Sequence, residues 1–197
     1  MKKRKKEEEL LIAVCVSAML GAIGFVLMLL EFPVAPIPAA AHLKMDLSDI
    51  PALFGAIVYG PVAGVVTEFI KNALELAVKG FGTQMGFGNL MNFIVGCAFV
   101  VPFSLVYRSL KKKEKETKGI VLGSIIGFLS IVLIGLGANY VIAPLFFKYF
   151  LGVVIDDASL WAAVGTATII NAVKGVLLSI VSVPIIKGIV TRIKGIA

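Results

Sequence analysis

The chain has 197 residues, of which 59% are hydrophobic and 16% are charged, and its net charge at pH 7 is +7. A soluble domain keeps about a quarter of its residues charged, so this composition argues against a soluble domain. It also argues against nucleic-acid binding as the purpose of the positive charge, because the basic residues gather at the ends of apolar runs, where membrane topology accounts for them.

The first apolar run, residues 10–30, follows the basic start MKKRKK and carries no charge. A transmembrane helix needs about 20 apolar residues, and this run is long enough. It is longer than the apolar core of a signal peptide, and the residues 31–33 form a poor cleavage site. We therefore predict a retained first helix.

Small residues recur in this first segment, with Ala18 and Ala22 four positions apart. Small residues at this spacing let two helices approach closely in lipid. The pattern is typical either of packing within one bundle or of a docking face for another membrane protein.

A proline-containing connection, residues 31–49, follows and ends in the sequence HLKMDLSDIP. Ser48 or Asp49 is expected to cap the next helix, because a side-chain oxygen or carboxylate suits a helix N-terminus. Lys44 and Asp46 precede the cap and are not explained by capping. Such groups are typical of an outer loop that closes over a pocket.

The pair Gly60-Pro61 predicts a break between a short second segment, 50–59, and a third, 61–79. The third segment places four polar residues on one helical face through spacings of three and four. We expect Lys71 and Glu75, an i,i+4 pair, to neutralise one another there. The four residues are Glu68, Lys71, Asn72 and Glu75.

Three more apolar segments, 87–108, 119–145 and 159–190, complete the prediction. The fold class is all-α: a single polytopic membrane domain of six transmembrane helices. Basic residues gather at positions 2–6, between 108 and 118, and after 186, which an even number of spans puts on one side. The positive-inside rule therefore predicts that both termini face the cytoplasm, with the plasma membrane as the location.

Polar residues inside the membrane are costly and usually functional. Asn171 and Lys174 share one face of the sixth segment, and Asn139 and Tyr140 lie in the second half of the fifth. One interpretation is that the amides join helices and that Lys174 pairs with a carboxylate. The other is that these groups line a site for a flat polar heterocycle, with Asn89 as a weaker candidate.

Enzymatic chemistry is not expected. The sequence has no phosphate-cradling loop and no H-E-x-x-H motif, and its single histidine, His42, lies in the outer connection. An autonomous ATP-driven pump is excluded, and no cofactor or metal is predicted.

The stretches LKMDLSDIPALFGAIVYGP and SAMLGAIGFVLM, with Asn171-x-x-Lys174, resemble the riboflavin-specific S component of energy-coupling factor (ECF) vitamin transporters. The resemblance covers essentially the whole chain. It implies a membrane subunit that captures riboflavin outside and works with a transmembrane coupling subunit and two cytoplasmic ATPases. It also implies that Ala18 and Ala22 face the coupling subunit.

The candidate ligand-binding residues come from the outer loop and from the later helices. They are Leu43, Lys44, Met45, Asp46, Asn89, Asn139, Tyr140, Asn171 and Lys174. Flavin mononucleotide (FMN) is left open as a second ligand, its phosphate received by Lys44 or by Lys148 in the expected 146–158 connection. Alternatives are an S component for thiamine, pantothenate or a queuosine precursor, and a non-transport membrane protein such as an assembly subunit or hydrolase.

Overall fold

The computed structural model describes residues 2–33, 44–80 and 86–190, and within them the chain is built from helices. The α-helices are α1 (Lys2–Leu29), α2 (Asp49–Val58), α3 (Pro61–Lys79), α4 (Phe87–Lys111), α5 (Glu116–Tyr149) and α6 (Asp157–Ile185). A π-helical turn, η2 (Ile186–Val190), continues α6. The all-α class is confirmed, with one addition: β1 (Phe32–Pro33) pairs antiparallel with β2 (Lys44–Met45).

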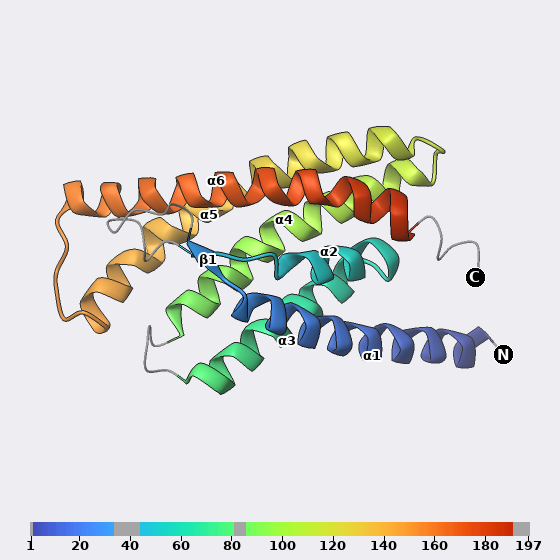
Figure 1. Cartoon of the computed structure of the whole chain (residues 1–197), viewed down its shortest axis with the longest axis horizontal. Helices are drawn as coiled ribbons and strands as arrows, with labels where there is room; N and C mark the ends of the chain where they lie inside the picture. Colours follow the sequence, from blue (N-terminus) through green and yellow to red (C-terminus); the bar gives the residue numbers. More distant parts are fainter. Residues whose placement is uncertain (1, 34–43, 81–85, 191–197) are drawn as a thin grey trace.

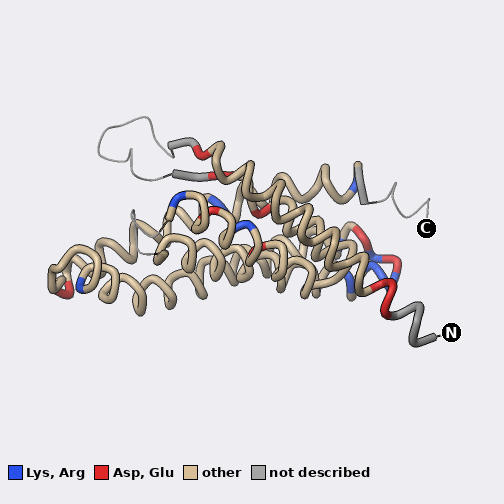
Figure 2. Tube along the Cα trace, turned by 90° about the horizontal axis from the view of Figure 1, so that it is seen from below, with Lys and Arg blue, Asp and Glu red and all other residues tan. Residues whose placement is uncertain are grey.

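Four helical stretches are long and apolar enough to cross a membrane, by length and composition: Glu7–Leu29, Phe87–Lys111, Glu116–Tyr149 and Asp157–Gly188. The helix α2 is apolar but short, and α3 carries the four polar residues noted above. Figure 1 shows that α1 begins, and η2 ends, at the end of the bundle where α4 connects to α5. Figure 2 shows charged residues at that end and a separate group inside the bundle.

Local sequence explains where several helices begin. Gly60 has φ 116°, a conformation that glycine adopts readily, and Pro61 then starts α3 at the position where a missing N–H costs least. The predicted break at Gly60-Pro61 is therefore correct. Asp156 caps α6 by accepting a hydrogen bond from Ser159 N (3.3 Å), which holds the pKa of this exposed carboxyl below its usual value.

Other expectations are corrected. Ser48 is the N-cap of α2, but neither its side chain nor that of Asp49 makes a capping hydrogen bond. Instead Asp46 Oδ1 accepts a hydrogen bond from Ser48 N (2.7 Å), while Asp49 turns toward α3 and α6. The helix α5 runs to Tyr149, so Lys148 lies on a helix and not in a connection.

The apolar core lies where α2, α4, α5 and α6 meet. Its fully buried side chains include Leu53 of α2, Phe99 and Phe103 of α4, Ile131 of α5 and Leu178 of α6. The helix α1 contributes none of its described residues to this core and packs mainly on α3, with Gly21 and Gly24 at the contact. The buried charged side chains lie outside this apolar core, on α2, α3 and α6: they are Asp49, Glu68, Lys71, Glu75 and Lys174.

Candidate functional site

A cavity of about 620 Å³ lies where α1 and α3 end and α4 begins. This volume falls in the range typical of small-molecule sites. Its wall is unusually polar for a membrane bundle and draws on all the long helices and on the segment before α2. The lining residues are Met28, Glu31, Asp46, Glu75, Lys79, Gly80, Gly88, Asn89, Met91, Asn92, Val95, Asn139, Ala167, Ile170, Asn171 and Lys174.

Lys174 of α6 lines this cavity, and its ammonium is held by two partners. Its Nζ lies 2.8 Å from Asp49 Oδ2 and donates to Asn92 Oδ1 at 2.9 Å. Asp49 sits behind the wall with its side chain fully buried, and does not line the cavity. The ammonium is therefore both oriented and neutralised from the back of the site.

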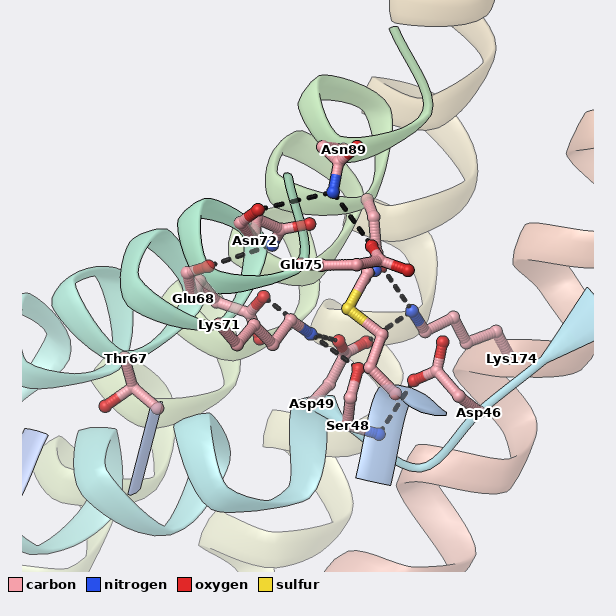
Figure 3. A network of polar contacts seen from close by, with 12 residues as sticks. Asp46, Ser48, Asp49, Thr67, Glu68, Lys71, Asn72, Glu75, Asn89 and Lys174 are labelled. Atoms are coloured by element: carbon pink, nitrogen blue, oxygen red, sulfur yellow. Dashed lines mark hydrogen bonds and ion pairs between the residues drawn. The ribbon is translucent and has the colours of Figure 1, made fainter. Parts of the chain in front are cut away.

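The pair continues into α3 as a buried ionic network (Figure 3). Lys71 Nζ contacts Asp49 Oδ1 and Ser48 Oγ, and it lies 2.8 Å from Glu68 Oε2. The side chains of Asp49, Glu68 and Lys71 are all fully buried. The expected Lys71–Glu75 pair is wrong, because Lys71 turns toward α2 instead.

Glu75 and Lys79 form the rim of the cavity. Lys79 Nζ donates to Glu75 Oε1 (2.6 Å) and lies 3.9 Å from Glu31 Oε1. Asn89 Nδ2 donates to Glu75 Oε2 (2.8 Å), which ties α4 to α3. At the rim, the ammonium group of Lys79 therefore already lies near two carboxylates, those of Glu75 and Glu31.

Two amides lie on the α5–α6 side. Asn139 Nδ2 donates to Gly135 O (2.7 Å) within α5. Among the residues that the structure describes, Asn171 Nδ2 is buried without a hydrogen-bond partner. A buried amide without a partner is costly, so a ligand that accepted its hydrogen bond would gain that energy.

The predicted site residues are brought together only in part. Five of them line the cavity: Asp46, Asn89, Asn139, Asn171 and Lys174. Tyr140 is not among the lining residues; the residue is 45% exposed, and the centroid of its ring lies 5.2 Å from that of the Trp161 ring. Leu43 lies outside the described residues, and for Lys44 and Met45 the structure describes only the β2 backbone.

Sequence reasoning missed the partners of the central lysine. A lone cation in an apolar run needs a carboxylate as its partner. The sequence contains several carboxylates, and it does not show that Asp49 is the one that lies beside Lys174. Asn92, Glu31 and Lys79 also line the cavity and were not among the predicted ligand-binding residues. The groups assembled here can donate and accept hydrogen bonds to an uncharged polar ligand.

The small residues of α1 divide between two faces. Ser17, Gly21 and Gly24 are buried, and a Cβ placed on Gly21 would lie 2.7 Å from Ile70 Cβ of α3. Ala18 and Ala22 are exposed, beside the exposed side chains of Met19 and Ile23. Packing within this chain therefore accounts for the glycines and not for the two alanines.

Comparisons with known proteins agree on one family. The model of the family described as "ECF transporter, substrate-specific component" matches residues 13–186. The riboflavin transporter FmnP of Bacillus subtilis (strain 168) is 33% identical over 168 residues, covering 84% of this chain and 85% of that protein. The riboflavin transporter RibU of Staphylococcus aureus (strain TCH60) is 30% identical over 182 residues, covering 91% and 90%.

A solved structure shows the same fold. It is described as "Structure and mechanism of the S component of a bacterial ECF transporter" and matches with a TM-score of 0.68 at 23% identity. The match covers 96% of this chain and 99% of that chain. The bundle described above is therefore a known membrane fold.

Proposed function

This chain belongs to the family of ECF transporter substrate-specific components, and on that premise we propose that it binds riboflavin from the outer side of the plasma membrane. Membership places it among multi-pass membrane transport proteins and not among enzymes. Riboflavin is the proposal's ligand because both relatives above are named riboflavin transporters.

The observation that carries the proposal is the cavity wall with the unpartnered amide of Asn171. The isoalloxazine ring of riboflavin is flat and uncharged and has donors and acceptors along one edge. Asn139, Asn171 and Lys174 offer complementary groups on one side of the cavity. Met28, Val95 and Ile170 supply apolar surface for the ring faces.

The proposed orientation of the chain in the membrane follows from the distribution of its basic residues. In the proposed topology six helices cross the membrane, in one substrate-binding domain, with both termini in the cytoplasm. The basic residues from Arg108 to Lys118 lie at the end of the bundle where α1 begins, and the cavity lies toward the ends of α1 and α3. The positive-inside rule then turns the cavity outward. The segment Leu43–Asp46 would close over the bound vitamin.

Transport needs further chains in this proposal, because the sequence has no ATP-binding loop. A transmembrane coupling subunit and two cytoplasmic ATPases would supply the energy. The exposed alanines Ala18 and Ala22 would form the contact with the coupling subunit.

The test is a titration of the purified chain in detergent. Protein from cells grown in rich medium should be yellow, and added riboflavin should lose fluorescence on binding. Asn171→Ala should weaken riboflavin binding by about tenfold or more, since it removes a buried donor worth on the order of 1.4 kcal/mol. Thr166→Ala on the same helix, where the hydroxyl donates only to Ala162 O, is the matched control.

Two results would contradict the proposal. A colourless chain that does not quench riboflavin fluorescence would leave another vitamin as the substrate. If Asn171→Ala bound riboflavin with unchanged affinity, this cavity would not be the riboflavin-binding site.

A further inference from the structure

The connection between β2 and α2 carries a residue of the cavity wall but is held from outside the cavity. Asp46 lines the cavity, and its Oδ1 accepts a hydrogen bond from Ser48 N (2.7 Å). Ser48 and Asp49 are fully buried and do not line the cavity. Their side chains turn toward α3, where Lys71 Nζ contacts both of them. The placement of this part of the wall therefore depends on one side chain of α3.

Lys71 is itself held by its own helix and by α1. Its ammonium donates to Ser48 Oγ at 2.9 Å and lies 2.8 Å from Glu68 Oε2, one turn earlier on α3. A Cβ on Gly24 of α1 would lie 3.1 Å from Ser48 O and 3.4 Å from Lys71 Cβ, so α1 packs directly against both residues. Because a buried ammonium loses its oxygen partners only at a large cost in free energy, Lys71 stays where these partners hold it.

The same contacts reach a second side of the cavity through Asp49 (Figure 3). Its Oδ1 contacts Lys71, and its Oδ2 lies 2.8 Å from Nζ of Lys174, which lines the cavity. Lys174 in turn donates to Oδ1 of Asn92 at 2.9 Å, and Asn92 also lines the cavity. Direct contacts thus connect Lys71 with wall residues on the connection before α2, on α6 and on α4.

We propose that Lys71 is a positioning residue for riboflavin binding, which fixes two residues of the cavity wall without touching the ligand. It acts on Asp46 through Ser48, and on Lys174 through Asp49. The inference rests on the proposed function and deepens it, because it names a residue outside the cavity on which the affinity of that cavity depends.

The physical reason is that a binding site formed in advance costs less to occupy. When only a fraction of the molecules has the wall in its binding arrangement, the apparent affinity falls by that fraction. The contacts of Lys71 keep the wall ordered before the ligand arrives, so little binding energy is spent on ordering it. Loosening the wall should act mainly on the rate at which the ligand leaves, as most changes at one binding site do.

The experiment measures how fast bound riboflavin leaves the folded chain. The purified full chain in detergent is loaded with radiolabelled riboflavin, an excess of unlabelled riboflavin is added, and the label that stays bound is followed with time. Ser48→Ala removes one acceptor of Lys71 and keeps the backbone N–H that donates to Asp46. We expect riboflavin to leave this variant about fivefold faster than the wild-type chain.

Ser104→Ala is the matched control, because it also removes a fully buried serine hydroxyl, one that donates to Val101 O (2.9 Å) within α4. It should release riboflavin at the wild-type rate. The rate separates positioning from stability, since a chain that is merely less stable still releases its ligand at the wild-type rate from the molecules that remain folded.

A second variant tests whether Ser48 acts through Lys71. Lys71→Met should release riboflavin at least about tenfold faster than the wild-type chain, because both wall residues lose their support. Adding Ser48→Ala to Lys71→Met should change the rate no further, since the partner of the hydroxyl is already gone. If Lys71→Met does not fold, the comparison of Ser48→Ala with Ser104→Ala alone carries the test.

The outcomes separate the two proposals. Release at the wild-type rate from Ser48→Ala overturns the inference and leaves the proposed function standing, and so do additive effects of Ser48→Ala and Lys71→Met. A wild-type chain that binds no riboflavin overturns the proposed function, and the inference with it.

Discussion

The α4–α5 contact and the junction of α2, α3 and α6 are built from opposite kinds of side chain. Along α4–α5, Gly119 faces the backbone of Tyr107, and Gly123 and Gly127 face the backbone and rings of Phe103 and Phe99. At the junction, Asp49, Glu68, Lys71 and Lys174 form a buried network of ion pairs. One region is close apolar packing and the other is buried charge.

This difference in side-chain type indicates that the two regions contribute differently to the stability of the chain. Close packing of glycine against aromatic rings stabilises helix association in lipid, where no hydrophobic driving force operates between helices. Buried ion pairs are weak evidence for stability, because desolvation offsets much of the Coulomb attraction. The network therefore needs another explanation, and its contact with the cavity through Lys174 supplies one.

The largest effect should come from breaking the ionic region. Lys71→Met leaves Asp49 and Glu68 buried with fewer partners, and we expect the free energy of unfolding to fall by about 3–5 kcal/mol. Thermal unfolding of the purified chain in detergent measures this loss.

Lys111→Met is the control from the other region. Lys111 pairs with Glu116 at 2.8 Å, but the two side chains are 21% and 36% exposed, so its loss should cost at most about 1 kcal/mol. Equal losses in the two variants would contradict the contrast between buried and exposed pairs.

The apolar region should respond to a single methyl group. A Cβ on Gly127 would lie 3.0 Å from Cε2 of Phe99, so Gly127→Ala should destabilise the chain by about 1–3 kcal/mol through overpacking. Gly165→Ala adds a methyl group where no atom lies within 4 Å, and should stabilise its helix by about 0.5–1 kcal/mol. If both variants melt at the wild-type temperature, the α4–α5 contact is less tightly packed than described.

A methyl group beside the cavity should affect binding more than stability. A Cβ on Gly135 would contact the side-chain amide of Asn171 and displace it from the cavity wall. We expect Gly135→Ala to weaken riboflavin binding by about tenfold, which corresponds to about 1.4 kcal/mol. Fluorescence titration measures this, and Gly137→Ala, with no atom within 4 Å, is the control. Equal affinities in both variants would remove Asn171 from the binding site.

The apolar region was largely predictable from sequence, whereas the ionic region was not. Runs of uncharged residues and the Gly60-Pro61 pair indicate helices by composition and local sterics, which do not depend on the rest of the fold. The partner of Lys71 depends on how α2 lies against α3, and local spacing favoured Glu75 where the fold brought Asp49 and Glu68.

In the candidate site, too, some residues could be predicted from the sequence and others could not. Asn171 and Lys174 were found because polar groups are conspicuous in an apolar run, and Asn139 by its depth in the fifth segment. The same reasoning grouped Tyr140 with them, although its position one residue after Asn139 turns it about 100° around the helix, toward Trp161. The pairing of Asp49 with Lys174 joins residues far apart in the chain, and no periodicity reports such a contact.

The smallest effect on the isolated chain should come from the exposed face of α1, which belongs to neither region. Ala22→Leu adds volume to a side chain that is exposed and so should change stability by less than about 0.5 kcal/mol and leave riboflavin affinity as it is. Uptake by cells that depend on imported riboflavin should nevertheless fail, because leucine would prevent the close helix approach that a coupling subunit needs. Ala162→Leu, at an exposed position on α6, should transport normally. Uptake that survives Ala22→Leu would place the coupling contact elsewhere, since the internal packing of α1 uses its glycines and leaves this alanine without a role in the isolated chain.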